Sequence, residues 1–577
     1  MTETGDKPLL TDRRKRIPSR RCHDGGMRSR WPAALSGVAA GALTLAVAEI
    51  GAALMTRGGM GTGTPSPLVA VAGAFVDRTP AWLKDFAIST FGTSDKLVLL
   101  LGMAVARTGI CALLGMLGAP TRAHPQGRVT LGLGPFALVG LGGVLAVLSR
   151  PNASWSDVLP TVLGTLVGLW VLDRLWRRLV VPVTAPAREA SAASGEVSAA
   201  GGEASTGGRY VTTADKVRER EASRRSVLVW GGALTVVGAL GILAGRTLSR
   251  AGEVVEAARE RLGTLRVAKP VTVPAGASQG VPGQTPYVTP NEEFYRIDTA
   301  ITVPQVDPET WRLRVTGMVD REVELSFQDL LDAELVEALV TLTCVSNYVG
   351  GNLAGNGIWT GLPVREVLAR AGVQDGADMV LSTSVDGFTA GTPLEAMTDD
   401  RNALIAVAQN GEPLLPEHGF PVRLVVPGLY GYVSATKWVT ELKVTRFDQD
   451  EGYWTPRGWS ARGPIKTASR IDVPRPGQQV DAGEVVIAGV AWAQHRGIDK
   501  VEVRIDGGDW QEATLAEEPT VDAWRQWKLP WPAEPGEHSI VVRATDGTGE
   551  VQTEELASPA PNGASGWHTI TVDVSAS

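Results

Sequence analysis

The stretch Leu339-Val-Thr-Leu-Thr-Cys344-Val-Ser-Asn347 contains the single cysteine of the C-terminal half, at the end of an apolar run typical of a β-strand. A glycine-rich segment, 350–357, follows at once, so the cysteine is predicted where a strand gives way to a loop. It is either a buried thiol that packs as a small hydrophobe or a thiolate ligand for a transition metal. Zinc and cysteine-protease chemistry are disfavoured, because no Cys-x-x-Cys pair, Cys/His cluster or recognisable partner histidine accompanies it.

A second informative stretch runs from Asn410 to Trp438. It contains His418, Arg423 and Lys437 within twenty residues, interleaved with Gly and Pro loops. Three such side chains can surround a phosphate or another anion. They can equally be a packed histidine and ordinary salt-bridge partners, so spacing alone leaves an anion site open.

The segments around these stretches predict an α+β domain over residues 286–462. Trp311–Val315 and Ala338–Cys344 alternate like strands, and Ser326-x-x-Asp329 is a capping box that predicts a short helix. Pro363–Ala371 is predicted to be a helix ended by Gly372. Strands and helices without a regular βαβ order indicate the α+β class.

Residues 463–577 change to an all-β pattern. Alternating stretches occur at Val485–Ala493, Val501–Ile505, Ser539–Ala544 and Thr569–Val574. Asp-Gly turn signals follow two of them, at 506–507 and 546–547. Spacing and length predict an immunoglobulin-like sandwich of about 110 residues.

The N-terminal half is predicted to lie in a membrane, where a spanning helix needs about 20 mostly apolar residues. Five stretches qualify: Ala33–Met55, Leu97–Gly118, Val129–Leu148, Val158–Leu172 and Val227–Gly245. A further segment, Leu68–Phe91, is interrupted by charges and Pro80, which predicts a half-helix or an interfacial helix. Arg107 places a charge inside the second span, as a functional or a structural residue. The predicted units are a basic tail (1–31), a membrane domain (32–181), a cytoplasmic linker (182–226), a last span (227–246) and a second linker (247–285).

Charge is divided unevenly along the chain. Residues 1–246 carry 28 Lys and Arg against 16 Asp and Glu, and residues 247–577 carry 27 against 46, giving balances of +12 and −19. The acidic half argues against a nucleic-acid partner. The N-terminal cations gather in the tail and in the segments after the second and fourth spans, which predicts a cytoplasmic N-terminus and an extracytoplasmic C-terminal half. Ser223-Arg224-Arg225 before the last span resembles a twin-arginine export signal, although ordinary positive-inside arginines give the same pattern.

Residues from about 286 to 577 resemble the sulfite oxidase family of molybdenum enzymes. The matching segments are Leu-Thr-Cys344-Val-Ser-Asn347, Asn410-Gly-Glu-Pro-Leu, His418-Gly-Phe-Pro-Val-Arg423, Lys437-Trp438, Gly489-Val-Ala-Trp492, Val501 to Trp510 and Arg543-Ala-Thr-Asp546. Several motifs in the same order are more specific than any single one. They favour the metal-ligand interpretation of Cys344.

This resemblance implies a molybdenum–molybdopterin cofactor whose metal takes the thiolate of Cys344. The residues it assigns to the cofactor site are Tyr295, Arg296, Cys344, His418, Arg423, Ser434 and Lys437. Arg296 is further expected to orient an anionic substrate. No haem domain or Cys-x-x-Cys-His site is visible.

The chain also departs from the family pattern. Val349 stands where animal sulfite oxidases have a substrate-pocket arginine, and Ile297-Asp298 stands where they have Asn-His. Tyr453 is the candidate for the tyrosine expected near the metal, and Arg457 is a candidate replacement for the missing cation.

Three functions are compatible with these observations. The first is a membrane-anchored, extracytoplasmic enzyme that transfers oxygen to a small sulfur-containing substrate and passes electrons to a cytochrome or quinone. The second is a sulfoxide reductase, for example of methionine sulfoxide, which the missing arginine favours and the C-terminal sandwich disfavours. The third is a non-enzymatic immunoglobulin-like binding protein. The family's sandwich mediates dimer formation, so a homodimer is expected by resemblance.

Overall fold

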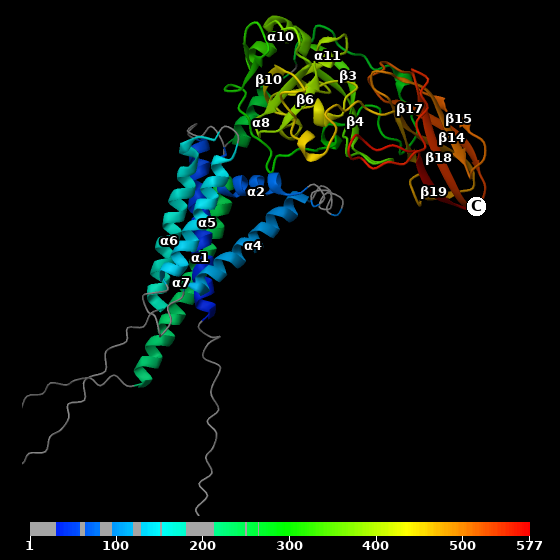
Figure 1. Cartoon of the computed structure of the whole chain (residues 1–577). Helices are drawn as coiled ribbons and strands as arrows, with labels where there is room; N and C mark the ends of the chain where they lie inside the picture. Colours follow the sequence, from blue (N-terminus) through cyan, green and yellow to red (C-terminus); the bar gives the residue numbers. More distant parts are fainter. Residues whose placement is uncertain are drawn as a thin grey trace, which may run out of the picture.

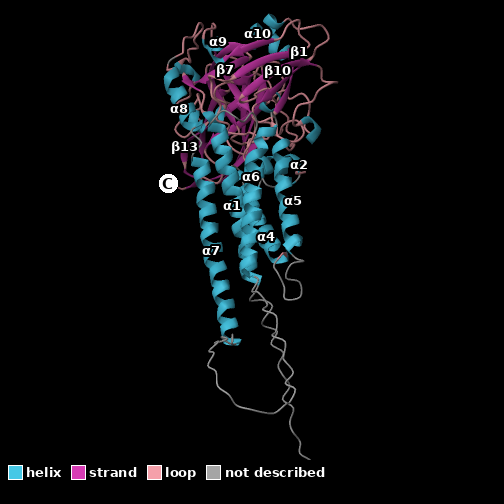
Figure 2. Cartoon of the chain, turned by 90° about the vertical axis from the view of Figure 1, so that its left-hand side faces the viewer, coloured by secondary structure: helices cyan, strands magenta, loops and turns pink. Residues whose placement is uncertain are grey.

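A computed structural model describes residues 30–57, 64–80, 83, 90, 95–118, 129–150, 153–179, 213–247, 251–263 and 265–576. The predicted basic tail before residue 30, the loop with Arg122 and Arg128, and residues 180–212 of the linker lie outside these ranges. Figure 1 shows an elongated helical bundle on one side and a β-rich half on the other. Figure 2, turned by 90°, shows the same separation of helices and strands.

Every apolar stretch predicted as a span lies in a helix. The helices of this half are α1 (Arg30–Arg57), α2 (Pro67–Arg78), α4 (Asp95–Leu117), α5 (Val129–Leu148), α6 (Leu159–Leu179) and α7 (Thr213–Thr247). Among the residues that the structure describes, four segments are long and apolar enough to cross a membrane: Trp31–Thr56, Val98–Leu117, Trp155–Leu179 and Arg225–Leu243. The apolar part of α5, Gly132–Leu148, is shorter, so the fifth span stays a prediction. Helix α2 is the expected short helix and ends before Pro80, and the Ser223-Arg224-Arg225 motif falls inside α7.

Small residues explain how the helices approach one another. A Cβ atom added to Gly37 of α1 would lie 1.9 Å from the carbonyl oxygen of Cys111 in α4, and one added to Gly115 would lie 2.2 Å from that of Ala33. Only glycine permits this approach, as is common where helices pack in membranes. These contacts join the N-terminal half of α1 to the C-terminal half of α4.

The next part of the chain contains two sheets, with strand orders β2-β1-β10-β5-β6 and β3-β4-β7-β8, and β9 also pairs with β7. The strands are β1 (Arg312–Gly317), β2 (Val323–Ser326), β3 (Val336–Thr343), β4 (Ala354–Pro363), β5 (Met379–Ser384), β6 (Thr389–Pro393), β7 (Leu404–Gln409), β8 (Glu412–Pro413), β9 (Arg423–Val425) and β10 (Val439–Thr445). The helices are α8 (Ala251–Leu262), α9 (Phe327–Leu331), α10 (Val364–Ala371) and α11 (Glu395–Thr398). Residues of both sheets, such as Leu313 of β1 and Ile405 of β7, share one buried core.

Local sequence signals account for the short helices here. Ser326 and Asp329 form the predicted capping box at the start of α9, and α10 ends at Gly372 with a φ of +74°. The expected alternation of Ala338–Cys344 is wrong, because both faces of β3 are covered: Val340 and Leu342 pack in one buried cluster and Leu339 in another. Helix α8 lies in the segment predicted as a linker, and its Val255 is buried against the second sheet.

The C-terminal part is a sandwich of two sheets, β11-β13-β17-β16 and β12-β19-β18-β14-β15. The strands are β11 (Ala468–Val473), β12 (Gln479–Asp481), β13 (Gly483–Trp492), β14 (Ile498–Ile505), β15 (Gln511–Glu512), β16 (Thr514–Leu515), β17 (Arg525–Ala533), β18 (Gly536–Asp546) and β19 (His568–Ser575). Ile487 and Trp527 of one sheet meet Val503 and Val542 of the other in one buried core. All four predicted stretches form strands, while the immunoglobulin-like assignment stays a prediction.

Helix α2 connects the helical bundle to the β-rich half. It lies across the end of the bundle next to the β-rich half (Figure 1). The Asp77 carboxylate accepts a hydrogen bond from Tyr453 Oη at 3.2 Å and forms an ion pair with Arg150 at 2.7 Å. One carboxylate thus joins α2 both to the end of α5 and to the loop after β10.

Candidate active site

Cys344 is the first residue after β3, and backbone hydrogen bonds fix its loop. Its N–H donates to the Leu353 carbonyl at 2.9 Å, and its own carbonyl accepts from Asn347 N at 3.0 Å. The Asn347 side chain closes the loop by accepting from Leu353 N at 2.8 Å. The thiol is free and buried. The glycine-rich sequence after the cysteine therefore forms a tight, defined turn.

The C-terminal sandwich supports this strand directly. Gln494, which is fully buried, donates to the Thr341 carbonyl at 2.9 Å and to Thr343 Oγ1 at 3.0 Å. Trp524 N donates to Thr341 Oγ1 at 2.7 Å. The position of Cys344 thus depends on contacts from both folded parts.

Burial raises the pKa of the Cys344 thiol, and hydrogen bonds from Ser346 only partly oppose this effect. Two tyrosines lie close enough to interact electrostatically with the sulfur, Tyr295 and Tyr430. Burial raises the pKa of both, in Tyr430 to about 12, so both hydroxyls stay protonated at neutral pH. A thiol in this position is protonated and inert unless a bound metal ion deprotonates it.

A cluster of cations lies beside this loop, and we call it the cation cluster. It consists of the cations Arg296, Arg423 and Lys437 together with the neutral ring of His418, and these residues come from three separate segments. Asp298 accepts from Lys437 Nζ at 2.7 Å and from Arg296 Nε at 3.1 Å. Asp298 is the only carboxylate that pairs with the cluster among the residues that the structure describes. The cluster therefore carries excess positive charge.

Arg423 shows this excess most clearly. Its guanidinium is buried, lies 4.9 Å from the centre of the Trp359 ring, and donates to the carbonyl oxygen of His418 at 3.2 Å. Within the described ranges no carboxylate pairs with it. Burial lowers the pKa of Arg423 to about 10, but the group remains charged at neutral pH. A buried, charged group without a counter-ion is costly, which indicates that an anion completes this site.

The other two buried members respond to the same environment. Burial, followed by the charges of Arg423 and Lys437, lowers the pKa of His418 to about 3, so its ring is neutral. His418 Nε2 lies 3.0 Å from the Asn291 carbonyl, which assigns the proton to this nitrogen. Burial lowers the pKa of Lys437 to about 8, against the opposing effect of Asp298. These donors suit a phosphate group and a polar ring system.

The structure places the other predicted residues differently. Arg296 lies with the cation cluster through Asp298, and Ser434 donates to the carbonyls of Leu429 and Tyr430 in its own loop. Tyr453 bonds Asp77 of α2, and the Arg457 guanidinium stacks on its ring at 3.7 Å. In the sequence, Asp298 stands out only as a departure from the family pattern. Its role as the counter-ion of Lys437 follows from their contact in the structure.

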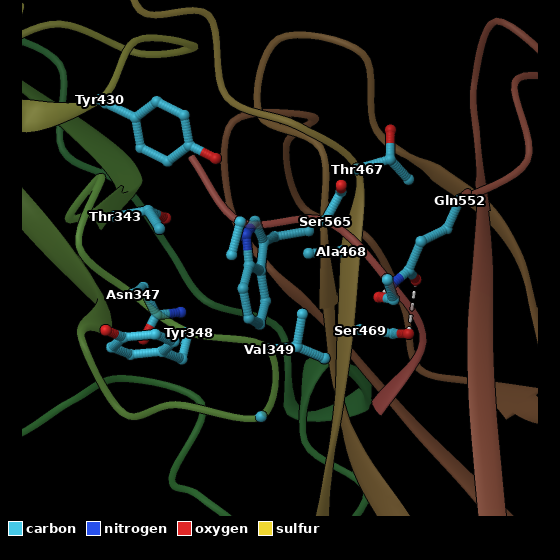
Figure 3. Close-up of a pocket in the computed structure, with 14 residues that line it drawn as sticks. Thr343, Asn347, Tyr348, Val349, Tyr430, Thr467, Ala468, Ser469, Gln552 and Ser565 are labelled. Carbon is cyan, nitrogen blue, oxygen red and sulfur yellow. Dashed lines mark hydrogen bonds between the residues drawn. The ribbon is translucent and has the colours of Figure 1, made fainter. Parts of the chain in front are cut away.

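A small cavity lies between the loop that follows Cys344 and the C-terminal sandwich (Figure 3). It is lined by Thr343 and Asn347 from the cysteine loop and by residues such as Thr467 and Gln552 from the sandwich. None of its described lining residues is charged, and Val349 is one of them. The cavity offers hydroxyl and amide hydrogen bonds to a small polar molecule.

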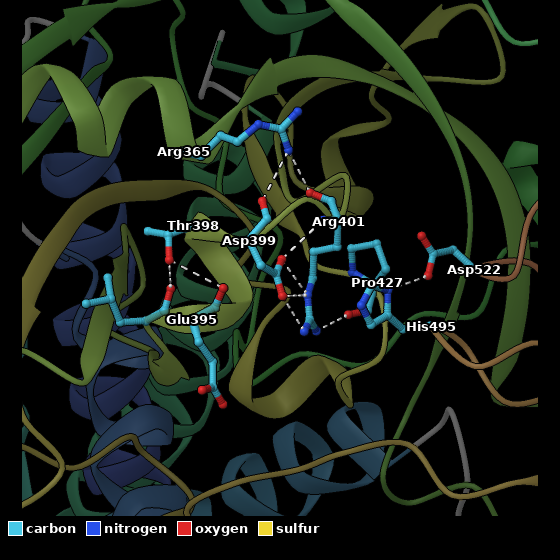
Figure 4. Close-up of polar contacts among 9 residues, drawn as sticks. Arg365, Glu395, Thr398, Asp399, Arg401, Pro427, His495 and Asp522 are labelled. Atoms are coloured by element: carbon cyan, nitrogen blue, oxygen red, sulfur yellow. Dashed lines mark hydrogen bonds and ion pairs between the residues drawn. The ribbon is translucent and has the colours of Figure 1, made fainter. Parts of the chain in front are cut away.

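A group of acidic and imidazole side chains lies elsewhere, between the two folded parts (Figure 4). Atoms of Asp399, Asp400 and His495 lie within 4.8 Å of one another. The Arg401 guanidinium, however, binds the Asp399 carboxylate at 2.7 and 2.9 Å, and His495 approaches Asp522 at 3.4 Å. We interpret this group as an ion-pair network and assign no metal to it.

Comparison with known proteins places both folded parts of the C-terminal half in known domain families. The model of the oxidoreductase molybdopterin binding domain matches residues 300–454, and that of the Mo-co oxidoreductase dimerisation domain matches residues 462–574. Mitochondrial sulfite oxidase of Homo sapiens is 33% identical over 342 residues, 50% of this chain and 62% of that protein. The uncharacterized oxidoreductase YuiH of Bacillus subtilis is 36% identical over 157 residues, 27% of this chain and 76% of that protein. The chain belongs to the sulfite oxidase family.

Family membership settles several of the expectations. The molybdopterin cofactor and the oxidoreductase class are confirmed, and the non-enzymatic alternative is wrong. The relatives named sulfite oxidase do not favour the sulfoxide-reductase alternative. The chain spans less than two thirds of the length of these relatives. The sulfane dehydrogenase SoxCD of Paracoccus pantotrophus is similar at 24% identity with a TM-score of 0.45, over 55% of this chain and 90% of that chain.

Proposed function

We propose that the chain is a membrane-anchored, extracytoplasmic sulfite oxidase-like enzyme that transfers oxygen to a small sulfur substrate. The observation that carries this proposal is the juxtaposition of a buried thiol, Cys344, with a buried cation cluster that lacks a matching number of carboxylates. A metal that needs a thiolate and a cofactor that carries a phosphate satisfy both features together.

In this proposal the residues of the site divide the work. Cys344 would hold molybdenum as a thiolate, which requires that its thiol proton be given up. Arg423 and Lys437 would hold the anionic end of molybdopterin. The Nε2–H of neutral His418 donates to the Asn291 carbonyl and fixes the ring, which leaves Nδ1 as an acceptor. When bound, the molybdenum centre supplies two-electron oxygen-atom transfer, while the protein supplies binding, orientation and charge.

The substrate is proposed to bind in the uncharged cavity between the loop after Cys344 and the C-terminal sandwich. Thr343 and Asn347 can position an oxygen atom of the substrate through their hydroxyl and amide groups. For sulfite, water supplies the transferred oxygen atom, and two electrons and two protons leave with each turnover. Arg296 belongs to the cation cluster through Asp298, so we assign it to cofactor binding before substrate orientation.

The anchoring and location rest on the helical half. We infer that α1, α4, α5, α6 and α7 cross the membrane. The apolar length of α1, α4, α6 and α7 and glycine contacts such as Gly115 with Ala33 support this, and α5 is included because its apolar part packs in the same bundle. Lys and Arg flank the ends of the helices that lie away from the β-rich half, which supports an extracytoplasmic active site. The match to a dimerisation domain supports a homodimer formed through residues 462–574.

The proposal is tested with the full chain in detergent or nanodiscs. After the molybdenum content has been measured, sulfite-dependent reduction of ferricyanide, a one-electron acceptor, is followed optically. The expected result is turnover in metal-loaded protein and none in protein from a cofactor-deficient host. Metal-loaded protein that leaves ferricyanide unreduced with sulfite contradicts the proposed function.

A further inference from the structure

Arg107 is a charge in the middle of a predicted membrane helix. It lies twelve residues after the start of α4 and ten before its end, which is about 18 and 15 Å along the axis. The hydrocarbon core is about 30 Å thick, so this position is close to its centre. Lipid phosphates remain at the surface, so they do not satisfy an arginine at this depth.

Arg107 has no partner in the part of the chain that the structure describes. It forms no hydrogen bond or ion pair there, and its Nε atom is buried and unpaired. The nearest groups with an electrostatic effect on it are Cys111, on the same face of α4, and Glu49 of α1. The Glu49 carboxylate is held at the start of α2 by Ser66 Oγ at 2.9 Å and Leu68 N at 3.2 Å. A charged residue at this depth normally faces a partner or a ligand.

The N-terminal half of α4 is left uncovered by the other helices that the structure describes. No residue from 98 to 110 is buried, whereas Cys111, Leu114 and Gly115 are. Gly102 and Gly109 have no atom within 4 Å of a Cβ position. Figure 1 shows α4 leaning away from the bundle toward the end of α2. Arg107 therefore lies one helical turn before Cys111, the first residue of α4 that packs against α1. At this position a lipid-soluble molecule can reach it from the bilayer.

The amino-acid composition of the helices limits the chemical class of ligand that Arg107 can bind. Helices α1, α2 and α4–α7 contain no histidine, which is the usual protein ligand of haem iron. These helices therefore offer no histidine to a haem of their own, and the acceptor that we consider is an organic molecule. Quinones reside in the hydrocarbon layer, carry carbonyl oxygens that accept hydrogen bonds from a guanidinium, and take up two electrons and two protons. This matches the two electrons and two protons released per oxygen transferred to sulfur.

We propose that Arg107 binds a carbonyl oxygen of a lipid-soluble quinone between α1 and the free half of α4. This rests on the proposed oxidase function, for which the quinone is the membrane acceptor. Removing the Arg107 guanidinium takes away a charge-assisted hydrogen bond, which should weaken quinone binding by a factor of about ten or more.

The test uses the full chain in nanodiscs of a neutral phospholipid, with decylubiquinone as the ligand and its thermal stabilisation of the protein as the readout. Arg107→Leu is compared with Arg107→Lys, which keeps the charge, and with Thr108→Ala. Thr108 is exposed, and its hydroxyl bonds only the Ala104 carbonyl of its own helix, at 2.7 Å. We expect at least tenfold weaker binding in Arg107→Leu, an intermediate effect in Arg107→Lys and wild-type binding in Thr108→Ala.

Sulfite-dependent ferricyanide reduction is measured on the same samples and is expected to be unchanged in all three variants. A failure of the proposed oxidase function appears there, in the wild type, and is separate from any effect on quinone binding. Equal quinone binding by wild type and Arg107→Leu overturns the inference, as does an absence of binding by the wild type. Arg107-dependent stabilisation by phosphatidylglycerol alone, without a response to quinone, assigns Arg107 to lipid and also overturns it.

Discussion

Replacing Arg423 by methionine should separate cofactor binding from stability. Burial lowers the pKa of this guanidinium to about 10, well below its ordinary value, which corresponds to a cost of about 3 kcal/mol for its charged form. Because the folded-state pKa is lower than the unfolded value, this cost is fully present at pH 7. Arg423→Met removes that cost and loses the contact with Trp359 and the hydrogen bond to His418, together about 1–3 kcal/mol. The cofactor-free variant is therefore expected to be as stable as wild type or more stable by up to about 2 kcal/mol.

Cofactor binding should respond in the opposite direction. A charged hydrogen bond to a phosphate contributes about 1.5–3 kcal/mol, so Arg423→Met is expected to weaken molybdopterin binding about ten- to 150-fold. The assay measures the melting temperature of the cofactor-free full chain and then the molybdenum content after loading. Arg470→Met is the matched control, because Arg470 is buried but pairs with Asp472 at 2.7 Å. Removing it leaves a buried carboxylate unpaired and costs about 3–5 kcal/mol. A destabilised Arg423→Met protein with normal molybdenum content would refute the reasoning.

Four further perturbations test other parts of the account. Cys344→Ser is expected to lose molybdenum and turnover while circular dichroism is unchanged, since the buried side chain keeps its size; full activity would remove Cys344 as a ligand. Val349→Arg places a cation in the uncharged cavity and is expected to lower the KM for sulfite about tenfold, with an unchanged KM excluding this cavity as the substrate site. Above pH 8, Lys437 loses its charge, because its folded pKa is lowered to about 8. Cofactor uptake by the apoprotein should therefore fall from pH 7 to 9, and Lys437→Met should show a flat profile. Tyr453→Phe removes the hydrogen bond to Asp77 and is expected to speed amide exchange in α2 without changing molybdenum content.

The sequence was most informative where local chemistry determines local structure. The capping box at Ser326 and the left-handed Gly372 each act through neighbouring backbone groups, so the ends of α9 and α10 were predictable. The alternation expected for the strand before Cys344 failed for the opposite reason. The alternation predicts one exposed face for this strand, but tertiary packing covers that face. The C-terminal sandwich contacts it through Gln494 and Trp524.

The residues of the candidate site also divide into those that a local motif reveals and those that only a tertiary contact reveals. His418, Arg423 and Lys437 were found because they lie within one stretch and match a family motif. Asp298 could not be assigned, since its role depends on a contact with Lys437 that is 139 residues away along the chain. Tyr453 was placed near the metal by its position in the sequence, whereas packing against α2 turns its hydroxyl toward Asp77.

The most direct test of the central claim is X-ray absorption at the molybdenum edge, on the full chain and on whatever metal-loaded fraction of Cys344→Ser can be prepared. The account predicts that the variant has one sulfur neighbour fewer than the wild type. An identical sulfur shell in both proteins would show that Cys344 does not bind the metal and would contradict the assignment of the site.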